Sequence, residues 1–160
     1  MKKNGFTLIE LMVVIVIMSI LSAIAIPKLF GMIAKSKASE ICPAAGTYVK
    51  LMDTYASESN AMGGWSLIGY AAPGSSTLSG YASTNFTYSG SIDANSYTTA
   101  NATNAWKAVA NVSLNDCSKN SDWHINTAIA TTNGVIEFTP VLSDASNCSV
   151  LTPEFTKIGK

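Results

Sequence analysis

The sequence predicts an α+β fold in which a long N-terminal α-helix packs, over its C-terminal half, on a small antiparallel β-sheet. Three observations lead to this prediction: an apolar run from Phe6 to Ile26, an apolar helical stripe that continues to about Ser57, and alternating strand patterns after Trp106. The 160 residues are enough for one domain plus one extended element, and not for two full cores.

The apolar run is long enough to cross a membrane. At ~1.5 Å per residue, residues 6–26 span about 31 Å as a helix. Lys2 and Lys3 precede the run, which predicts a cytoplasmic N-terminus and an exported remainder. Three interpretations compete: a secretory signal peptide ending at the A-x-A-like stretch 23–25, a plain membrane anchor, or a segment that is both cut and retained.

Glu10 favours the third interpretation. A carboxylate in the middle of an apolar span costs about 2.5–3.5 kcal/mol on insertion scales, and less near the interface. Neither a signal peptide nor a simple anchor has a use for that charge. Glu10 is therefore expected to have a cationic partner at the same depth.

The stretch Lys2-Lys3-Asn4-Gly5-Phe6-Thr7-Leu8-Ile9-Glu10 resembles the prepilin signature of type IV pilins and type II secretion pseudopilins. The resemblance covers about the first thirty residues. It implies that residues 1–5 are a leader, cut between Gly5 and Phe6 by a membrane aspartyl protease, the prepilin peptidase. The same enzyme would N-methylate Phe6. In the filament, Glu10 of an incoming subunit would then neutralise the Phe6 amine of a neighbour and set the axial register.

The resemblance also implies a function and a location. The chain would be a structural subunit, the major pilin, of a homo-oligomeric helical filament, and not an enzyme. It would wait as a single-pass protein of the inner membrane until an assembly platform and its ATPase extract it into a cell-surface pilus. Family roles are adhesion, twitching motility and DNA uptake. The alternatives are a type II secretion pseudopilin and, more weakly, a secreted carbohydrate-binding domain behind an ordinary signal peptide.

The helical pattern continues beyond the apolar run. Apolar residues recur at three- and four-residue spacing from Ala34 to Tyr55, which predicts one helix of roughly 78 Å over 6–57. Residues 6–27 would form the membrane span and filament core, and 28–58 an amphipathic continuation. Pro27 is expected to kink this helix, because proline removes a helical hydrogen bond and clashes with the preceding turn. Pro43, with Gly46 nearby, predicts a second kink or a break.

The remainder divides into two segments. Residues 59–105 are rich in Gly, Ser, Thr and Asn, and are predicted to be a connecting loop with one or two short strands, one of them at Phe86–Tyr88. Residues 106–160 are predicted to hold an antiparallel sheet: strands at 106–114, 123–129 and 135–141, with a hairpin turn at Thr132-Asn133-Gly134. Pro140 suggests an edge strand or a strand end.

Two of the three cysteines are predicted to form a disulfide. Cys117 and Cys148 both lie in turn-like polar stretches of a chain that is expected to be exported. Their bond would close a loop of about 30 residues, worth roughly 3–4 kcal/mol, around the predicted hairpin. Cys42 is expected to be a small buried apolar residue.

Composition argues against several other functions. Only 12% of the residues are charged, the net charge is zero and arginine is absent, so a nucleic-acid site is not expected. With one histidine, His124, and no Cys-x-x-Cys, no catalytic site, metal site or cofactor is predicted. Asp116, Asp122 and Asp144 would bind calcium only if they converged.

The three tryptophans divide between the core and the surface. Trp106 and Trp123 are expected in the core, where large aromatic side chains contribute most burial. Trp65 follows Gly63-Gly64 and is expected to be the exposed one. A carbohydrate or another surface ligand is therefore the further partner to be tested.

Overall fold

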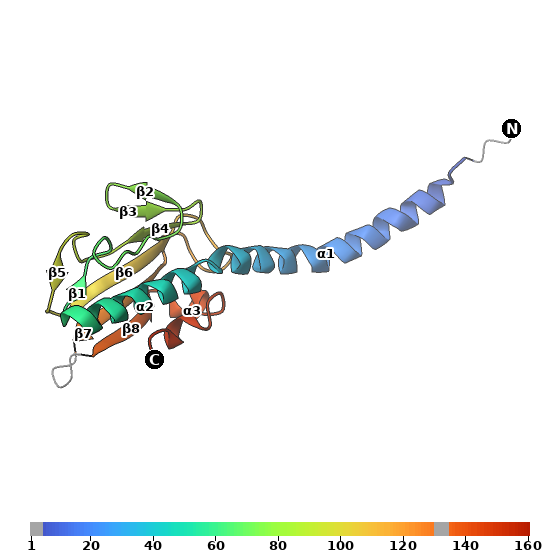
Figure 1. Ribbon diagram of the computed structural model, residues 1–160. Helices are drawn as coiled ribbons and strands as arrows, with labels where there is room; N and C mark the ends of the chain where they lie inside the picture. The colour runs from blue at the N-terminus through green and yellow to red at the C-terminus, as the bar shows by residue number, and fades with distance from the viewer. Residues whose placement is uncertain (1–4, 130–134) are drawn as a thin grey trace. The chain divides into compact units, whose positions relative to one another are not determined.

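A computed structural model describes residues 5–129 and 135–160 (Figure 1). The chain divides into two compact units, Met1–Ile33 and Ala34–Lys160. Helices and strands follow in the order α1 (Leu8–Ala38), α2 (Ile41–Ser59), β1 (Met62–Gly63), β2 (Ser75–Thr77), β3 (Gly80–Ala82), β4 (Phe86–Ser89), β5 (Tyr97–Thr98), β6 (Ala102–Ala110), β7 (Asp122–Ile129), β8 (Ile136–Leu142), α3 (Ala145–Cys148) and the 3₁₀ helix η1 (Phe155–Lys157). The predicted α+β class is confirmed.

The first unit is almost entirely one stretch of α1. Its large apolar side chains are exposed in the single chain, from Phe6 at 78% to Ile33 at 42%. Among the described residues there is one helical stretch whose length and apolar composition would let it cross a membrane. Pro27 lies inside α1, and the helix continues through it to Ala38.

The predicted single helix over 6–57 is interrupted. Residues 39 and 40 form a turn between α1 and α2, so the break lies before Pro43 and not at it. Pro43 is the third residue of α2, where the missing N–H leaves no helical bond unmade. In a continuous helix, however, the Pro43 ring would clash with the backbone carbonyl of Ser39, four residues earlier. Pro43 thus accounts for a break that ends α1 and starts α2.

The second unit contains a six-stranded antiparallel sheet in the order β2-β3-β4-β6-β7-β8. The predicted alternation in β7 is confirmed: Trp123, Ile125 and Thr127 are buried, and the residues between them are half-buried. The strand β8 pairs with β7 from Trp123–Leu142 to Ile129–Ile136 and lies at the sheet edge, as Pro140 suggested. The predicted hairpin turn at 132–134 lies outside the described residues.

The segment 59–105 holds more sheet than predicted. It contains β1 to β5, and β6 begins at Ala102, before the predicted start at Trp106. The strands β2, β3 and β4 extend the main sheet, whereas β1 and β5 form a separate two-stranded sheet. The strand predicted at Phe86–Tyr88 is present as β4, and burial alternates along it. The other four strands are two or three residues long, too short to show a period-two pattern.

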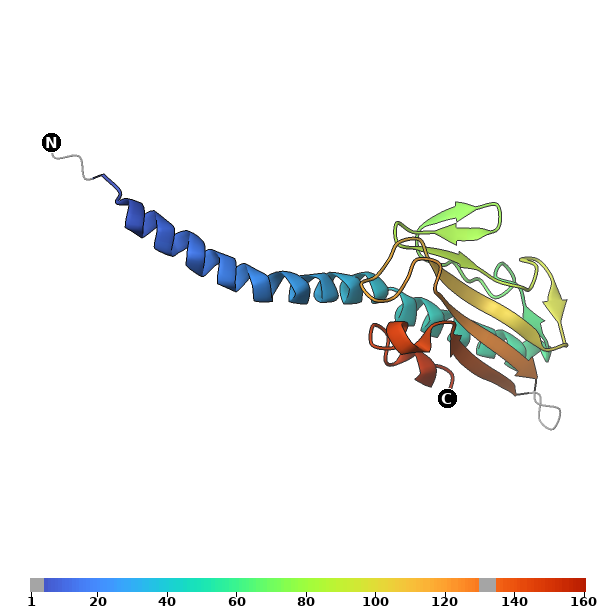
Figure 2. The ribbon, with the colours of Figure 1, turned by 180° about the vertical axis from the view of Figure 1, so that it is seen from behind.

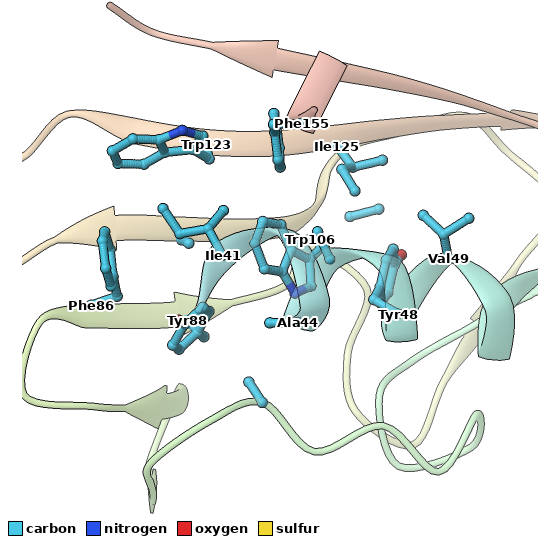
Figure 3. Close-up of a cluster of buried hydrophobic side chains, with 14 of the residues drawn as sticks. Ile41, Ala44, Tyr48, Val49, Phe86, Tyr88, Trp106, Trp123, Ile125 and Phe155 are labelled. Carbon is cyan, nitrogen blue, oxygen red and sulfur yellow. The ribbon is translucent and has the colours of Figure 1, made fainter. Parts of the chain in front are cut away.

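Helix α2 covers one face of the sheet (Figures 1 and 2). Its buried residues recur at three- and four-residue spacing, which places them on one side: Ile41, Ala44, Ala45, Tyr48, Val49, Met52 and Ala56. They meet Trp106, Ile125 and Phe155 in the core (Figure 3). Deep burial of these large side chains is the main source of the second unit's stability.

Each tryptophan indole is buried and donates a hydrogen bond to a different segment of the chain. Trp123 Nε1 donates to Thr152 Oγ1 at 2.8 Å, and Trp106 Nε1 donates to the Tyr70 hydroxyl at 2.8 Å. Trp65 Nε1 donates to the Ala105 carbonyl at 3.3 Å. Trp65 is only 7% exposed, so the expectation that it is a surface residue is wrong. The two preceding glycines allow close packing that holds Trp65 in the interior: Gly63 lies against the Tyr55 ring, and Gly64 lies against the backbone of residues 93–94.

The predicted disulfide between Cys117 and Cys148 is present. It joins the β6–β7 connection to α3, with Cα atoms 4.9 Å apart and a sequence separation of 31. Both cysteines are buried, and Cys42 is free and half-buried on α2. The disulfide therefore holds the C-terminal segment, including the buried Phe155, against the sheet.

Candidate functional site

The first turn of α1 is closed by a reciprocal cap between Thr7 and Glu10. Thr7 Oγ1 accepts from the Glu10 backbone N–H at 3.3 Å, and Glu10 Oε2 accepts from the Thr7 backbone N–H at 2.8 Å. The Thr7 hydroxyl also donates to the same Oε2 at 2.5 Å. This arrangement is a capping box, which satisfies N–H groups that a helix start otherwise leaves unpaired.

The two carboxylate oxygens of Glu10 differ in their bonding. Oε2 accepts both hydrogen bonds from Thr7, and Oε1 accepts none from the described residues. Glu10 is also the only charged residue between Gly5 and Pro27 in the sequence. The ion pairs of the described residues lie in the second unit and involve Asp122 and Glu154. One anionic oxygen of Glu10 is thus available for an external donor.

The surface beside Glu10 is an open apolar groove of ≈ 370 Å³. It is lined by Phe6, Ile9, Glu10, Val13 and Val14. In the single chain Glu10 is exposed, and water screens its charge. Once a second apolar segment covers the groove, a cation there would interact with the carboxylate more strongly than in water. The groove is therefore suited to a donor that carries a positive charge on an otherwise apolar segment.

Gly5 and Phe6 precede the helix and are exposed. A Cβ atom at Gly5 would meet nothing within 4 Å, so the fold places no steric demand for glycine at this position. Gly5, Phe6 and Glu10 come together on one short stretch because they are close in sequence. Pro27 lies further along the same helix and is not part of this site.

Sequence reasoning overlooked Thr7, although a signal was present. Thr-x-x-Glu before an apolar run is the sequence signature of a capping box. It also overlooked Glu40. The Glu40 Oε1 atom accepts from Ser83 Oγ at 2.6 Å and from the Tyr88 hydroxyl at 3.0 Å, which joins the α1–α2 turn to the sheet.

The acidic residues considered for calcium are each engaged locally. Asp122 accepts from His124 at 2.7 Å and lies 3.8 Å from Lys107 Nζ. Asp144 caps α3 through the Asn147 backbone N–H, and Asp116 accepts from Asn115. His124 lies on β7, an interior strand of the sheet, and its side chain is only 18% exposed.

A comparison with known protein families matches the same N-terminal stretch. Residues 1–26 match the family model described as the prokaryotic N-terminal methylation motif. Two sequences of the type IV major fimbrial protein FimA from Dichelobacter nodosus are each 44% identical to this chain over 52 residues. Each match covers 32% of this chain and 33% of the relative, so the alignment spans about a third of the length of these curated relatives. Over these 52 residues the chain is similar to a type IV fimbrial protein.

Proposed function

We propose that this chain is the structural, major subunit of a type IV pilus and polymerises through α1. The proposal includes cleavage between Gly5 and Phe6 and N-methylation of Phe6. The observation that carries it is the lone Glu10, with one carboxylate oxygen held by Thr7 and the other unbonded within the described residues. The N-terminal methylation motif and the fimbrial relatives support the same proposal.

The exposed apolar surface of α1 supports polymerisation. A row of exposed Leu, Ile, Val and Met side chains from Leu8 to Ile33 is unfavourable in water, since burying apolar surface gains about 25 cal/mol per Å². A membrane would cover this surface before assembly, and copies of α1 would cover it afterwards. Storage in the inner membrane followed by release into a surface filament is consistent with both coverings.

The charge on Glu10 supports a specific role in register. Cleavage after Gly5 would create a positively charged amine at Phe6, on an otherwise apolar segment. When a second subunit docks, its Glu10 Oε1 would accept from the Phe6 amine of the first, while its Oε2 keeps its bonds to Thr7. A buried charge without a partner costs several kcal/mol, so a subunit in the wrong register would be rejected.

We also propose that this chain interacts with the further partners that the family resemblance implies. These are the prepilin peptidase, an inner-membrane assembly platform and an ATPase, with adhesion, twitching motility or DNA uptake as roles of the filament. None of these partners requires a catalytic group in this chain.

Three substitutions separate the charge of Glu10 from its capping role. Glu10→Gln keeps an oxygen that accepts from Thr7 but removes the charge, and Glu10→Val removes both. Thr7→Ala removes the cap, at a cost of about 1 kcal/mol in helix stability, but keeps the charge. We expect Glu10→Gln and Glu10→Val to be processed normally yet to leave the subunit in the membrane, and Thr7→Ala to assemble.

Electron microscopy of surface filaments and mass spectrometry of the membrane fraction give the readout. Normal filaments from Glu10→Gln would show that capping, and not charge, is what the site supplies, and the register proposal would be wrong. Filaments confined to an envelope-spanning secretion apparatus would favour the pseudopilin alternative. A released chain that begins at Ile26 would favour the ordinary signal peptide.

A further inference from the structure

A cavity of ≈ 460 Å³ opens on the second unit, and none of the residues that carry the proposed assembly role lines it. Three segments form its wall: the stretch after β1, the β2–β3 hairpin, and the connection from β4 to β5. Its size falls within the range of about 300–1,000 Å³ that is usual for small-molecule sites.

The inner part of the cavity is aromatic. The rings of Trp65 and Tyr81 are nearly parallel, at 28° with centroids 6.2 Å apart, and Tyr70 meets Trp65 edge-on at 5.0 Å. The polar atoms of the two deeper rings are already used: Trp65 Nε1 donates to Ala105, and the Tyr70 hydroxyl accepts from Trp106 and donates to Ala44. Trp65 and Tyr70 are also buried, so they form the support behind the cavity, and the half-buried Tyr81 provides the ring that a ligand can reach.

The rim of the cavity is polar and has no internal partners. The side chains of Ser66, Ser76, Thr77, Ser79 and Asp93 line it and are exposed. None of them has a side-chain hydrogen bond within the described part of the chain, whereas most polar side chains nearer the core are paired. Asp93 is the one charged residue among the lining residues, and no Lys, Arg or His is among them.

The geometry of the cavity is fixed by its backbone. A Cβ atom at Gly90 would lie 2.6 Å from Trp65 Nε1, so glycine at 90 allows the indole to sit against that strand end. Gly80, at φ 146°, adopts a conformation that favours glycine and brings the β2–β3 hairpin against the Tyr88 carbonyl. Both positions line the cavity, which is therefore preformed and needs no ligand to shape it.

We propose that this cavity binds an uncharged saccharide of one or two pyranose rings. The apolar C–H face of a pyranose would pack on Tyr81, and the rim hydroxyls would donate to and accept from the sugar hydroxyls. The Asp93 carboxylate would accept from two neighbouring sugar hydroxyls, a charge-assisted arrangement. Sialylated, sulfated or phosphorylated sugars are disfavoured because their anionic groups would meet Asp93 and no cation. The proposal does not rest on filament assembly.

The test uses the full-length protein in lipid nanodiscs, which avoids detergents with sugar headgroups. The labelled protein is applied to an array of immobilised neutral oligosaccharides together with their sialylated and sulfated counterparts, and affinities of positive glycans are then measured in solution. We expect binding to neutral glycans, weakened about tenfold or more by Tyr81→Ala, which corresponds to ~1.4 kcal/mol or more. Tyr81→Phe, which keeps the ring, should stay within about threefold of the parent.

Asp93→Ala provides a second variant that does not disturb the core, since Asp93 is exposed and its side chain is unbonded. It should also weaken binding about tenfold. Tyr97→Ala and Asp53→Ala are the matched controls, because both residues are exposed and outside this cavity. Binding only to anionic glycans, binding that survives Tyr81→Ala and Asp93→Ala, or no binding to any glycan on the array would each overturn the proposal.

Discussion

Two glutamates at helix starts are satisfied by hydrogen bonds and not by cations. Glu10 accepts twice from Thr7, and Glu40 accepts from Ser83 and Tyr88 across 43 and 48 residues of sequence. A carboxylate at a helix N-terminus is favoured by the helix dipole and by unpaired N–H groups. In each glutamate one carboxylate oxygen accepts both bonds. The difference is that the partner of Glu10 lies in its own helical turn, whereas the partners of Glu40 join two distant segments of the chain.

Removing the Glu40 carboxylate should destabilise the second unit. In Glu40→Ala the Tyr88 hydroxyl and the Ser83 hydroxyl lose their acceptor, and a buried donor without a partner costs about 1–3 kcal/mol. Urea unfolding of the full-length chain measures the loss. Glu58→Ala is the control, since Glu58 is exposed on the same helix and should change the unfolding free energy by less than about 0.5 kcal/mol. Equal effects of the two variants would contradict this role for Glu40.

Buried tyrosines should make the second unit sensitive to alkali. Burial raises the pKa of Tyr70 to about 12, and burial is also the main cause that raises the pKa of Tyr48 and of Tyr88, the latter helped by the Glu40 carboxylate. Since these folded-state values exceed the unfolded value of about 10, the tyrosines' contribution is complete below pH ~10 and is lost as pH rises through the folded pKa.

The unfolding free energy should therefore fall above pH ~10 by about 1 kcal/mol per pH unit for each of these tyrosines. Urea unfolding at pH 9, 10, 11 and 11.5 measures the slope. Tyr70→Phe should reduce the slope, because one of the titrating groups is removed. A constant unfolding free energy across this range would contradict the burial of the three hydroxyls.

At the scale of elements, the break between α1 and α2 shows what a sequence pattern can and cannot locate. Pro43 predicted a kink or break in the long helix, and a break exists, but it lies at residues 39–40. Proline affects the turn that precedes it, so the interruption appears about four residues before the ring. Of the short strands, β4 was predicted at Phe86–Tyr88. The strands β1, β2, β3 and β5 were not predictable, because two or three residues carry no periodic signal.

Replacing Pro43 should join the two helices. In Pro43→Ala, the new amide at 43 would be able to donate to the Ser39 carbonyl, and the turn at 39–40 would become helical. Amide hydrogen exchange measured by NMR reports this directly. Ala44 is the internal reference, because its backbone N–H already donates to the backbone carbonyl of Glu40 at 3.3 Å. Exchange at position 43 as fast as in an unstructured chain would mean that another feature holds the break.

The disulfide is the strongest single tie on the C-terminal segment. Replacing both cysteines in Cys117→Ala/Cys148→Ala should lower the unfolding free energy by about 3–4 kcal/mol, since the bond closes a loop of 31 residues around β7 and β8. Cys42→Ala is the control and should have a smaller effect, as that thiol is free and half-buried. Comparable losses in the two variants would indicate that packing, and not loop closure, is responsible.

For the whole molecule, the two units differ in how far sequence predicts them. Residues 5–33 follow simple rules, since an apolar run of membrane length with one acidic residue allows few interpretations. In the second unit, the α2 stripe, the β7–β8 pair and the disulfide were predictable from periodicity and turn residues. The cavity at Trp65 was not, because it depends on glycine backbones at 80 and 90 that bring distant segments together.

The central claim is that this chain is cut after Gly5 and polymerises through α1 with Glu10 as the register contact. Fibres sheared from the cell surface, imaged by electron microscopy and analysed by mass spectrometry, test it most directly. The expected result is fibres built of this chain with N-methyl-Phe6 as the first residue, which disappear in Glu10→Gln and persist in Thr7→Ala. Fibres that lack this chain, a mature chain that begins at Ile26, or normal fibres from Glu10→Gln would contradict the claim.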